Sequence, residues 1–272
     1  MSVENLESEG ELIVIGTGIL GYAHMTVEAL SALEWAEDIF YLVSDSLTER
    51  WLLETYPHAR TLYHHYKEGE ARLHSYQTMC EEVLASVRKK KNTVLASYGH
   101  PGNHAYPTRL AIHKARSEGF SARMLPAVAA DSCLMADLLV DPGDNGWQSV
   151  EATDLLLESV DFSVFRPLVI WQPAVIGDLT YSHDRVNQEA FDLLKKRLVK
   201  LYGPDHKVCI YEASTYAVMK PRMDWLLLSE LLPDLFTCIS TLFIPELQCH
   251  AEQGSLSEEL CSVIRGKEVL EL

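Results

Sequence analysis

The sequence predicts an α/β protein in which a parallel sheet forms the N-terminal part and a smaller mixed α/β region follows. Short apolar runs alternate with longer segments of helical periodicity from residue 11 onward, which is typical of strand–helix–strand units with right-handed crossovers. The chain has 272 residues, of which 47% are hydrophobic and 23% charged, enough for two domains of ordinary size. We expect an acidic leader, an N-terminal domain, a C-terminal domain and a tail at residues 1–10, 11–126, 127–246 and 247–272.

The N-terminal domain contains the clearest strand signals. The run Glu11-Leu-Ile-Val-Ile15 is followed by glycines, which is typical of a strand buried on both faces of a parallel sheet. The predicted strands are 11–15, 39–43, 92–97 and 123–125. Helices are predicted where apolar residues recur at helical spacing, at 24–37, 74–90 and 107–118.

The pattern changes after Pro126. Three further strands are predicted, at 168–171, 207–211 and 241–244, with a long helix at 184–201 between the first two. Residues 141–146 form a turn cluster of Asp, Pro, Gly and Asn. Residues 255–266 are expected to form a terminal helix that begins at a Ser cap and ends at Gly266.

Charge and cysteine content exclude several classes of protein. The net charge is −16, and such a field repels phosphate backbones, so we expect no nucleic acid partner and take the charge as a source of solubility. The six cysteines are scattered without a CxxC pair, which is typical of reduced thiols. No secretory signal or membrane-spanning apolar run is visible, so we expect a cytoplasmic protein that binds no membrane.

A glycine motif leaves one alternative open. Gly16, Gly18 and Gly21 follow the first strand and fit GxGxxG, a pattern that lets a backbone approach a pyrophosphate. Asp45, after the second strand, would be the ribose ligand of an NAD-dependent dehydrogenase, but it lies beyond the usual spacing of about 20 residues. Glycine-rich first turns also occur in α/β folds that bind no dinucleotide, so the motif is weak by itself.

A more specific resemblance begins at Ser97-Tyr-Gly-His-Pro-Gly102 and at residues 122–142. Supporting stretches are 71–79, 170–172, 211–214 and 240–245. In this order and at these separations, they resemble the tetrapyrrole methylase superfamily of S-adenosylmethionine-dependent methyltransferases. Within it, the chain most resembles the peptide backbone α-N-methyltransferases of the borosin natural-product family, from about residue 11 to Pro245.

The resemblance implies a tetrapyrrole methylase-like fold of two α/β domains, with S-adenosylmethionine in the interdomain cleft and S-adenosylhomocysteine as product. It also implies a homodimer, and a first glycine loop that holds no dinucleotide. Asn103 and His104 depart from the Val-Phe usual in the family, and Ala127 and Ala129 stand where Gly and Ser are common. The residues that fall at the family's cofactor positions are Tyr98, His100, Asn103, Ala130, Gln172, Ala213, Ser240 and Thr241.

Methylation of a backbone amide requires a base, because the nitrogen lone pair is delocalised into the carbonyl. It also requires hydrogen-bond donors for the carbonyl oxygen and close alignment of the reacting atoms. The resemblance places Tyr66, Arg72 and Tyr76 in the substrate pocket, with Tyr98 beside them. Our hypothesis is that Tyr76 is the base, that Arg72 favours its charged form, and that Tyr66 or Tyr98 donates to the amide oxygen. Arg72 and Tyr76 are four residues apart and lie on one face if this segment is a helix. Without the resemblance, Tyr66 and Tyr76 would be interpreted as ordinary surface-to-core residues and Arg72 as a solvated charge.

No metal site is expected. His64 and His65 are adjacent, and His100 and His104 are four apart, but zinc needs a third or fourth ligand, and Pro101 favours a loop between the second pair. We interpret these histidines as residues of the cofactor loop and the pocket wall.

The expected substrate is a separate precursor peptide. In the fungal branch of the family, the enzyme carries its substrate as a C-terminal extension. Residues 247–272 lack an apolar, β-branched core and contain several acidic residues, which resembles the split type, where a ribosomal precursor is methylated in trans. Two alternatives remain: a small-molecule methyltransferase of the tetrapyrrole type, without the Tyr66, Arg72 and Tyr76 set, and a catalytically silent peptide-binding protein.

Overall fold

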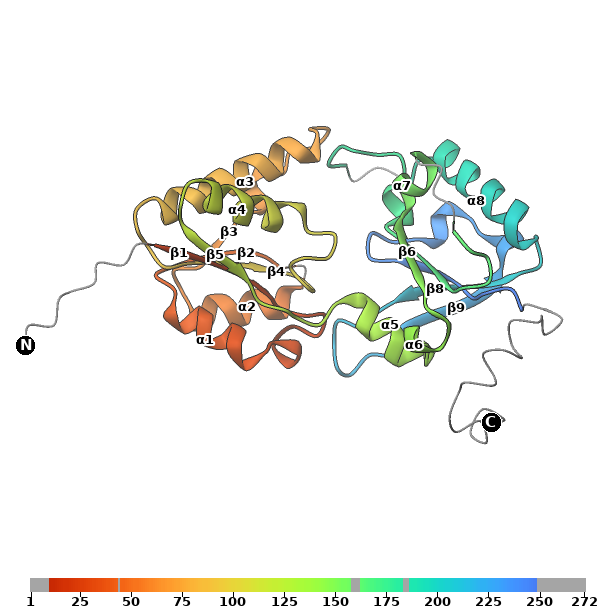
Figure 1. The fold of residues 1–272 in the computed structure, drawn as a ribbon, viewed down its shortest axis with the longest axis horizontal. Coiled ribbons are helices and arrows are strands. Elements are labelled where there is room, and N and C mark those ends of the chain that lie inside the picture. Colours follow the sequence, from red (N-terminus) through yellow and green to blue (C-terminus); the bar gives the residue numbers. More distant parts are fainter. Residues whose placement is uncertain (1–9, 44, 158–161, 183–185, 249–272) are drawn as a thin grey trace, which may run out of the picture.

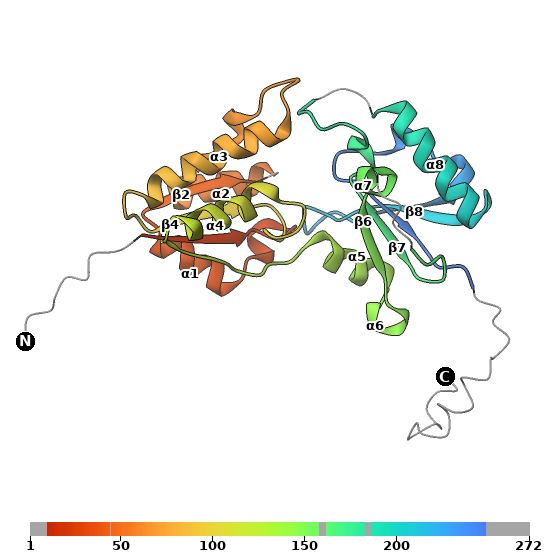
Figure 2. The same ribbon diagram turned by 45° about the horizontal axis from the view of Figure 1, so that its top comes forward.

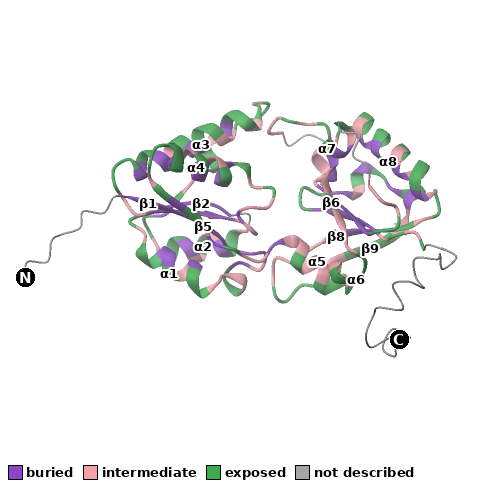
Figure 3. Cartoon of the chain, in the orientation of Figure 1, coloured by how far each residue is buried: buried purple, intermediate pink, exposed green. Residues whose placement is uncertain are grey.

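Two five-stranded sheets organise the chain, one in each half (Figure 1). The computed structural model describes residues 10–43, 45–157, 162–182 and 186–248. The two halves lie side by side, and buried residues follow both sheets (Figures 2 and 3). The predicted α/β fold class is therefore confirmed. In the described part of the chain, no helix has the length and apolar character needed to cross a membrane.

The first sheet is parallel throughout, as predicted. Its strands are β1 (Glu11–Gly16), β2 (Asp38–Leu42), β3 (Arg60–Thr61), β4 (Thr93–Ser97) and β5 (Ser121–Met124), in the order β3-β2-β4-β1-β5. Leu12 pairs with Thr93 and Gly16 with Ser97, so β1 and β4 end at the same edge of the sheet. Because β1 and β4 lie inside the sheet, their side chains are buried on both faces.

Helices cover both faces of this sheet (Figure 1). They are α1 (Val27–Trp35), α2 (Ser46–Thr55), α3 (Arg72–Val87) and α4 (Tyr106–Ser117), with short 3-10 helices η1 (Gly21–His24) and η2 (Tyr63–His65). Leu12 and Val14 pack under α3 and α4, whereas Ile13 and Ile15 pack under α1 and α2. The alternation follows from the two-residue repeat of a strand.

The second sheet is mixed, with the order β6-β7-β10-β8-β9. Its strands are β6 (Gln148–Glu151), β7 (Leu168–Trp171), β8 (Lys207–Glu212), β9 (Arg222–Leu227) and β10 (Thr241–Ile244). Its helices are α5 (Ala130–Leu138), α6 (Pro142–Asn145), α7 (Ala152–Leu157) and α8 (Gln188–Tyr202), with η3 (Pro173–Val175), η4 (Leu228–Glu230) and η5 (Pro233–Leu235). Only β6 and β7 run parallel; the other neighbouring strands are antiparallel. The expected break near residue 126 falls between β5 and α5.

Several elements differ from the prediction. The helix predicted at 24–37 begins only at Val27, because the Thr26 side chain caps it by accepting from the Ala29 amide. The turn expected at 141–146 contains the single helical turn α6, capped by Asp141. The elements not predicted are α2, β3, α5, β6, α7 and β9. The terminal helix expected at 255–266 lies outside the described residues.

A buried polar contact ties β2 to α3 and β4. The Ser86 hydroxyl donates to the Asp38 carboxylate at 2.6 Å and lies 2.9 Å from the Thr93 hydroxyl. Burial of Asp38 works to raise the pKa of its carboxyl, but the Ser86 hydrogen bond and the nearby Lys91 and Arg60 charges outweigh burial and lower this pKa.

Replacing Asp38 by Asn should lower the free energy of unfolding at pH 7 by about 1–3 kcal/mol, because hydrogen bonds to a charged group are lost. A carboxyl whose pKa is lowered by folding stabilises the fold above its ordinary value of 3.8, and this contribution disappears as the pH falls through the lower folded value. Urea denaturation should therefore show that the difference in unfolding free energy between wild type and Asp38→Asn shrinks as the pH falls below 3.8. The control Glu34→Gln, at an exposed position of α1, should change stability by less than about 0.5 kcal/mol. An Asp38→Asn deficit that is unchanged at low pH would contradict this account.

Candidate functional site

A pocket lies between the two halves, at the edge where β1 and β4 end. The loops after β1 and β4 form one side, and the start of α5, the end of β7 and the segment before β10 form the other. The lining residues are Ile19, Tyr98, Gly99, His100, Asn103, His104, Ala129, Ala130, Trp171, Gln172, Cys238, Ile239, Ser240 and Thr241. Crevices outside the carboxyl ends of parallel strands are the usual ligand sites of α/β folds. We call this space the first pocket.

The glycine loop after β1 is held by the protein itself. Gly18 and Gly99 exchange two backbone hydrogen bonds, of 3.2 and 3.0 Å, and His24 Nδ1 accepts from the amides of Ile19 and Leu20 at 3.3 and 3.2 Å. A Cβ on Gly16 would collide with the Gly99 carbonyl, and one on Gly18 with His24. These contacts account for the glycines by packing.

The other parts of a dinucleotide site also have structural roles. A Cβ on Gly21 would collide with the Thr48 side chain. Asp45, the alternative ribose ligand, caps α2 by accepting from the Thr48 amide at 2.8 Å. The GxGxxG match therefore requires no bound pyrophosphate, and the dehydrogenase alternative loses its support.

The loop after β4 presents its backbone to the first pocket. The Tyr98 amide donates to the Leu42 carbonyl at 2.8 Å, and Gly99 has a φ of +64°, which favours glycine. His100 Nδ1 accepts from the Gly102 amide at 3.0 Å. This side-chain contact closes the His-Pro-Gly turn and fixes the edge of the pocket.

The opposite wall is held by a partly buried carboxylate. Glu212 Oε1 accepts from the Ser240 hydroxyl at 2.5 Å, from the Thr237 hydroxyl at 2.8 Å and from the Arg222 guanidinium at 2.9 Å. Burial of Glu212 works to raise its pKa, but these hydrogen bonds lower it overall, so the carboxylate stays charged and positions Ser240. Thr241 is buried on β10, where it pairs with Trp171 on one side and Tyr211 on the other.

Seven of the eight residues expected at the cofactor line the first pocket. These are Tyr98, His100, Asn103, Ala130, Gln172, Ser240 and Thr241. Ala213 is not among the lining residues; it packs against the buried cluster that also receives Ala130. The sequence analysis had assigned His104 to the cofactor loop and pocket wall, and it missed Ile19, Gly99, Ala129, Trp171, Cys238 and Ile239. Most of these residues directly precede or follow an expected residue in the sequence, and this adjacency is the signal that could have identified them.

A second cavity, of about 450 Å³, adjoins the first pocket. Its walls come from α3 and α4 of the first half, and from β6, α7 and residue 179 of the second. The lining residues are Arg72, Leu73, Tyr76, His104, Tyr106, Arg109, Glu151, Thr153, Asp154, Leu157, Gln172 and Leu179. His104 and Gln172 line both spaces, so the two cavities meet at these side chains.

The two shared residues have unusual backbones. His104 has a φ of +49° and Gln172 a φ of +57°, in the left-handed region that non-glycine residues rarely adopt. Such conformations cost on the order of 1 kcal/mol or more each and concentrate at functional sites. Lys90 and Leu139 also have positive φ, away from both cavities, so the junction is marked by its shared lining residues and not by φ alone.

The four expected catalytic residues are spread around this junction. Arg72 and Tyr76 line the second cavity and Tyr98 the first pocket. Tyr66 lines neither; its ring packs edge-on against Tyr76, with centroids 6.2 Å apart, and stacks on Tyr181 at 4.5 Å. The hypothesis that these residues act together rests on the Tyr66–Tyr76 contact and on the meeting of the two cavities.

The partly buried phenols Tyr66 and Tyr98 are affected by burial in the same direction. Burial raises the pKa of Tyr66, and a side-chain hydrogen bond to Tyr76 raises it further. Burial also raises the pKa of Tyr98. Both hydroxyls therefore stay protonated at neutral pH and can donate.

Arg72 joins the two halves of the molecule. Its guanidinium donates to the Asp178 carbonyl, and its amide donates to the Leu179 carbonyl at 3.0 Å. Nearby, the Gly69 amide donates to Tyr181 and the Tyr181 amide to Glu70, each at 2.8 Å. Residues 69–72 and 178–181 therefore form a backbone bridge between the halves. Arg72 and Tyr76 line the same cavity, which supports the hypothesis that Arg72 favours the charged form of Tyr76.

His104 is expected to be neutral at pH 7. The residue is exposed, and its ring opens onto both cavities 5.3 Å from the Trp171 ring. Partial desolvation, aided by the Arg109 charge, lowers the His104 pKa below 6.5.

An NMR titration of the histidine rings should show two imidazoles with midpoints below 6.5, from His24 and His104, and the signal that disappears in His104→Gln is assigned to His104. Since folding favours the neutral ring, the stability contributed by His104 is present above pH 6.5 and is lost as the pH falls toward the lower folded pKa. A His104 midpoint above the ordinary value would contradict the desolvated environment.

Comparison with known proteins identifies the family. The family model of the Tetrapyrrole (Corrin/Porphyrin) Methylases matches residues 11–220. The methyltransferase/ribosomally synthesized cyclic peptide dendrothelin A precursor of Dendrothele bispora is 39% identical over 215 residues, which are 79% of this chain and 51% of that protein. A methyltransferase/ribosomally synthesized type I borosin cyclic peptide precursor of Coprinopsis marcescibilis is 36% identical over 242 residues, which are 87% of this chain and 62% of that protein. The borosin resemblance is thereby confirmed, although the chain spans only about half to two thirds of the length of these relatives.

A solved structure gives the same fold. The uroporphyrin-III C-methyltransferase of Thermus thermophilus, crystallised in complex with S-adenosylhomocysteine, superposes with a TM-score of 0.58 at 15% identity, covering 87% of this chain and 98% of that one. At this identity the likeness concerns the fold alone. Together with the family match over residues 11–220, it shows that this chain belongs to the tetrapyrrole methylase family.

Proposed function

We propose that this protein transfers a methyl group from S-adenosylmethionine to backbone amide nitrogens of a precursor peptide. The observation that carries the proposal is the meeting of the two cavities at His104 and Gln172. One cavity has walls suited to an adenosyl cofactor, and the other contains an arginine and tyrosines beside room for a polypeptide. The relatives named as cyclic peptide precursors support a peptide as the acceptor.

The first pocket fits the methyl donor chemically. Ile19, Ile239 and the Trp171 ring offer apolar surface for a flat base. Ser240 and Thr241, in the same wall, offer hydroxyl groups that can form hydrogen bonds with a ribose. Gly99 lets the chain backbone approach the ligand without a side chain in between. When bound, the cofactor supplies a methyl group on a positively charged sulfur.

The residues of the second cavity would perform the proton transfer. Burial and the neighbouring Tyr76 raise the pKa of Tyr66, so Tyr66 stays protonated beside the Tyr76 ring. The Tyr76 phenolate would take the proton from the amide nitrogen, and the nitrogen would then form its bond to the methyl carbon. Arg72 would favour the charged form of Tyr76, and Tyr66 or Tyr98 would donate to the carbonyl oxygen, on which negative charge develops. The peptide nitrogen loses a proton and gains a methyl group, and the cofactor leaves as a neutral thioether.

The charges of the second cavity do not favour a tetrapyrrole. Arg72 and Arg109 are offset by Glu151 and Asp154 in the same walls, whereas a porphyrin precursor with several carboxylates would require an excess of cations. A peptide backbone, which is neutral, suits this mixed lining. Dimerisation, implied by the family resemblance, is part of the proposal and would be measured as the mass of the protein in solution.

Cofactor binding can be tested by filling the first pocket. Ala130→Leu places a larger side chain in its wall and should weaken S-adenosylhomocysteine binding at least tenfold in a calorimetric titration. The control Ala136→Leu lies on the same helix at an exposed position and should bind as the wild type does. Equal affinities in the two variants would contradict the claim that the cofactor binds in the first pocket.

The division of roles can be tested separately from binding. Arg72→Ala and Tyr76→Phe should abolish methylation while S-adenosylhomocysteine affinity stays within about threefold of wild type, since neither residue lines the first pocket. The control Tyr22→Phe, at an exposed phenol, should retain full activity. The assay is mass spectrometry of a precursor peptide added as a separate molecule, where each transfer adds about 14 Da. Full methylation by the double variant would contradict the assignment, and a mass ladder on the enzyme chain would contradict action in trans.

A further inference from the structure

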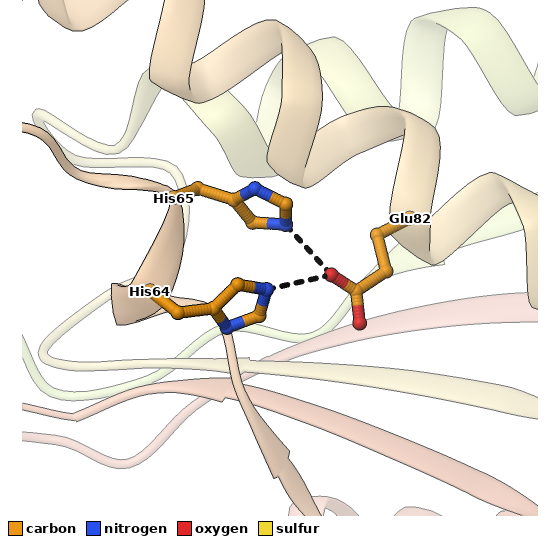
Figure 4. A group of neighbouring side chains, drawn as sticks. All are labelled: His64, His65 and Glu82. Atoms are coloured by element: carbon orange, nitrogen blue, oxygen red, sulfur yellow. Dashed lines mark hydrogen bonds and ion pairs between the residues drawn. The ribbon is translucent and has the colours of Figure 1, made fainter.

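Two histidines and a glutamate converge on the surface beside η2 (Figure 4). His64 Nε2 lies 3.2 Å and His65 Nε2 2.6 Å from the same oxygen, Glu82 Oε2. The imidazole rings are 4.1 Å apart, and the three ligand atoms all lie within 4.8 Å of one another. His64 and His65 come from η2 and Glu82 from α3. None of them lines the first pocket or the second cavity.

An ion pair alone explains this arrangement poorly. One carboxylate oxygen receives two imidazoles, and if both were protonated, two like charges would lie side by side around a single negative charge. Arg88 and Lys114 pair with the preceding residue, Glu81, and not with Glu82. A divalent cation between neutral imidazoles and the carboxylate satisfies all three side chains.

The spacing suits zinc. In a tetrahedral site with ligand bonds of about 2.0–2.2 Å, neighbouring ligand atoms are separated by roughly 3.3 Å. The His64 distance already has this value, and the His65 contact would open by several tenths of an ångström. Two histidines and one glutamate form a zinc ligand set known from other proteins. The His64 side chain is 54% exposed, which leaves the fourth position open to water.

We propose that His64, His65 and Glu82 form a zinc-binding site that clamps η2 onto α3. The sequence analysis expected no metal because no third ligand could be assigned to the adjacent histidines; the fold supplies Glu82 from a position 17 residues further on. Tyr66 directly follows His65, and its ring packs on Tyr76 of α3. Zinc therefore fixes the two segments that hold this tyrosine pair in place.

Zinc binding should be measured by calorimetry on the untagged full chain, stripped of metal with a chelator. We expect one zinc per chain at this site, and at least a tenfold loss of affinity in His64→Ala and in Glu82→Gln. His74→Ala is the matched control, because His74 lies on α3 and pairs only weakly with Glu70, at 3.6 Å; it should bind as the wild type does. Binding by cysteine thiols would be common to all four proteins. Wild-type affinity in both His64→Ala and Glu82→Gln would overturn the proposal.

Two further measurements locate the metal and its effect. Anomalous diffraction from a zinc-soaked crystal should show a peak within about 2.0–2.2 Å of both Nε2 atoms and of a Glu82 oxygen. Hydrogen exchange of residues 63–66 and 72–82 should slow at least threefold when zinc is added to the wild type, and should not change in Glu82→Gln. An anomalous peak elsewhere would refute the site, and unchanged exchange in zinc-bound wild type would refute the clamp.

Discussion

The pairing of Gly18 with Gly99 is the contact on which the arrangement of the site depends. It joins the loops that leave β1 and β4 by two backbone hydrogen bonds. Both residues have positive φ, of +69° and +64°, a conformation that favours glycine. The paired loops form one wall of the first pocket and set where Ile19, Tyr98 and His100 lie. A glycine pattern that resembles a nucleotide loop thus serves the packing of one loop against another.

The second half of the chain completes the site with rigid elements. Trp171 and Thr241 face each other in neighbouring antiparallel strands, and the Tyr211 hydroxyl donates to Asp137 of α5 at 2.7 Å. These contacts hold the far wall of the first pocket at fixed positions relative to the second sheet. His104 and Gln172, one from each half, meet across the gap with left-handed backbones. They are two of the four non-glycine residues with positive φ in the described chain, and the two that both cavities share.

The sequence predicts the centre of each sheet better than its margins. The strands β1, β4, β7, β8 and β10 are continuous apolar runs because they are buried on both faces. By contrast, β9 is an edge strand whose Trp225 is half exposed, and β3 has only two residues, so neither has a distinct pattern. α2 has exposed apolar residues such as Leu47 and Leu53, which obscure its buried face. Likewise, Glu82 could not be joined to His64 and His65 from sequence, because their contact depends on how η2 packs on α3.

The backbone bridge between residues 69–72 and 178–181 gives the molecule a second connection between its halves, besides the chain that runs from β5 to α5 (Figures 1 and 2). The second cavity has walls from both halves and includes Arg72 and Leu179 of the bridge itself. A polymer lying there would contact both halves and the bridge at once. Opening of the bridge would therefore remove part of the wall that holds it.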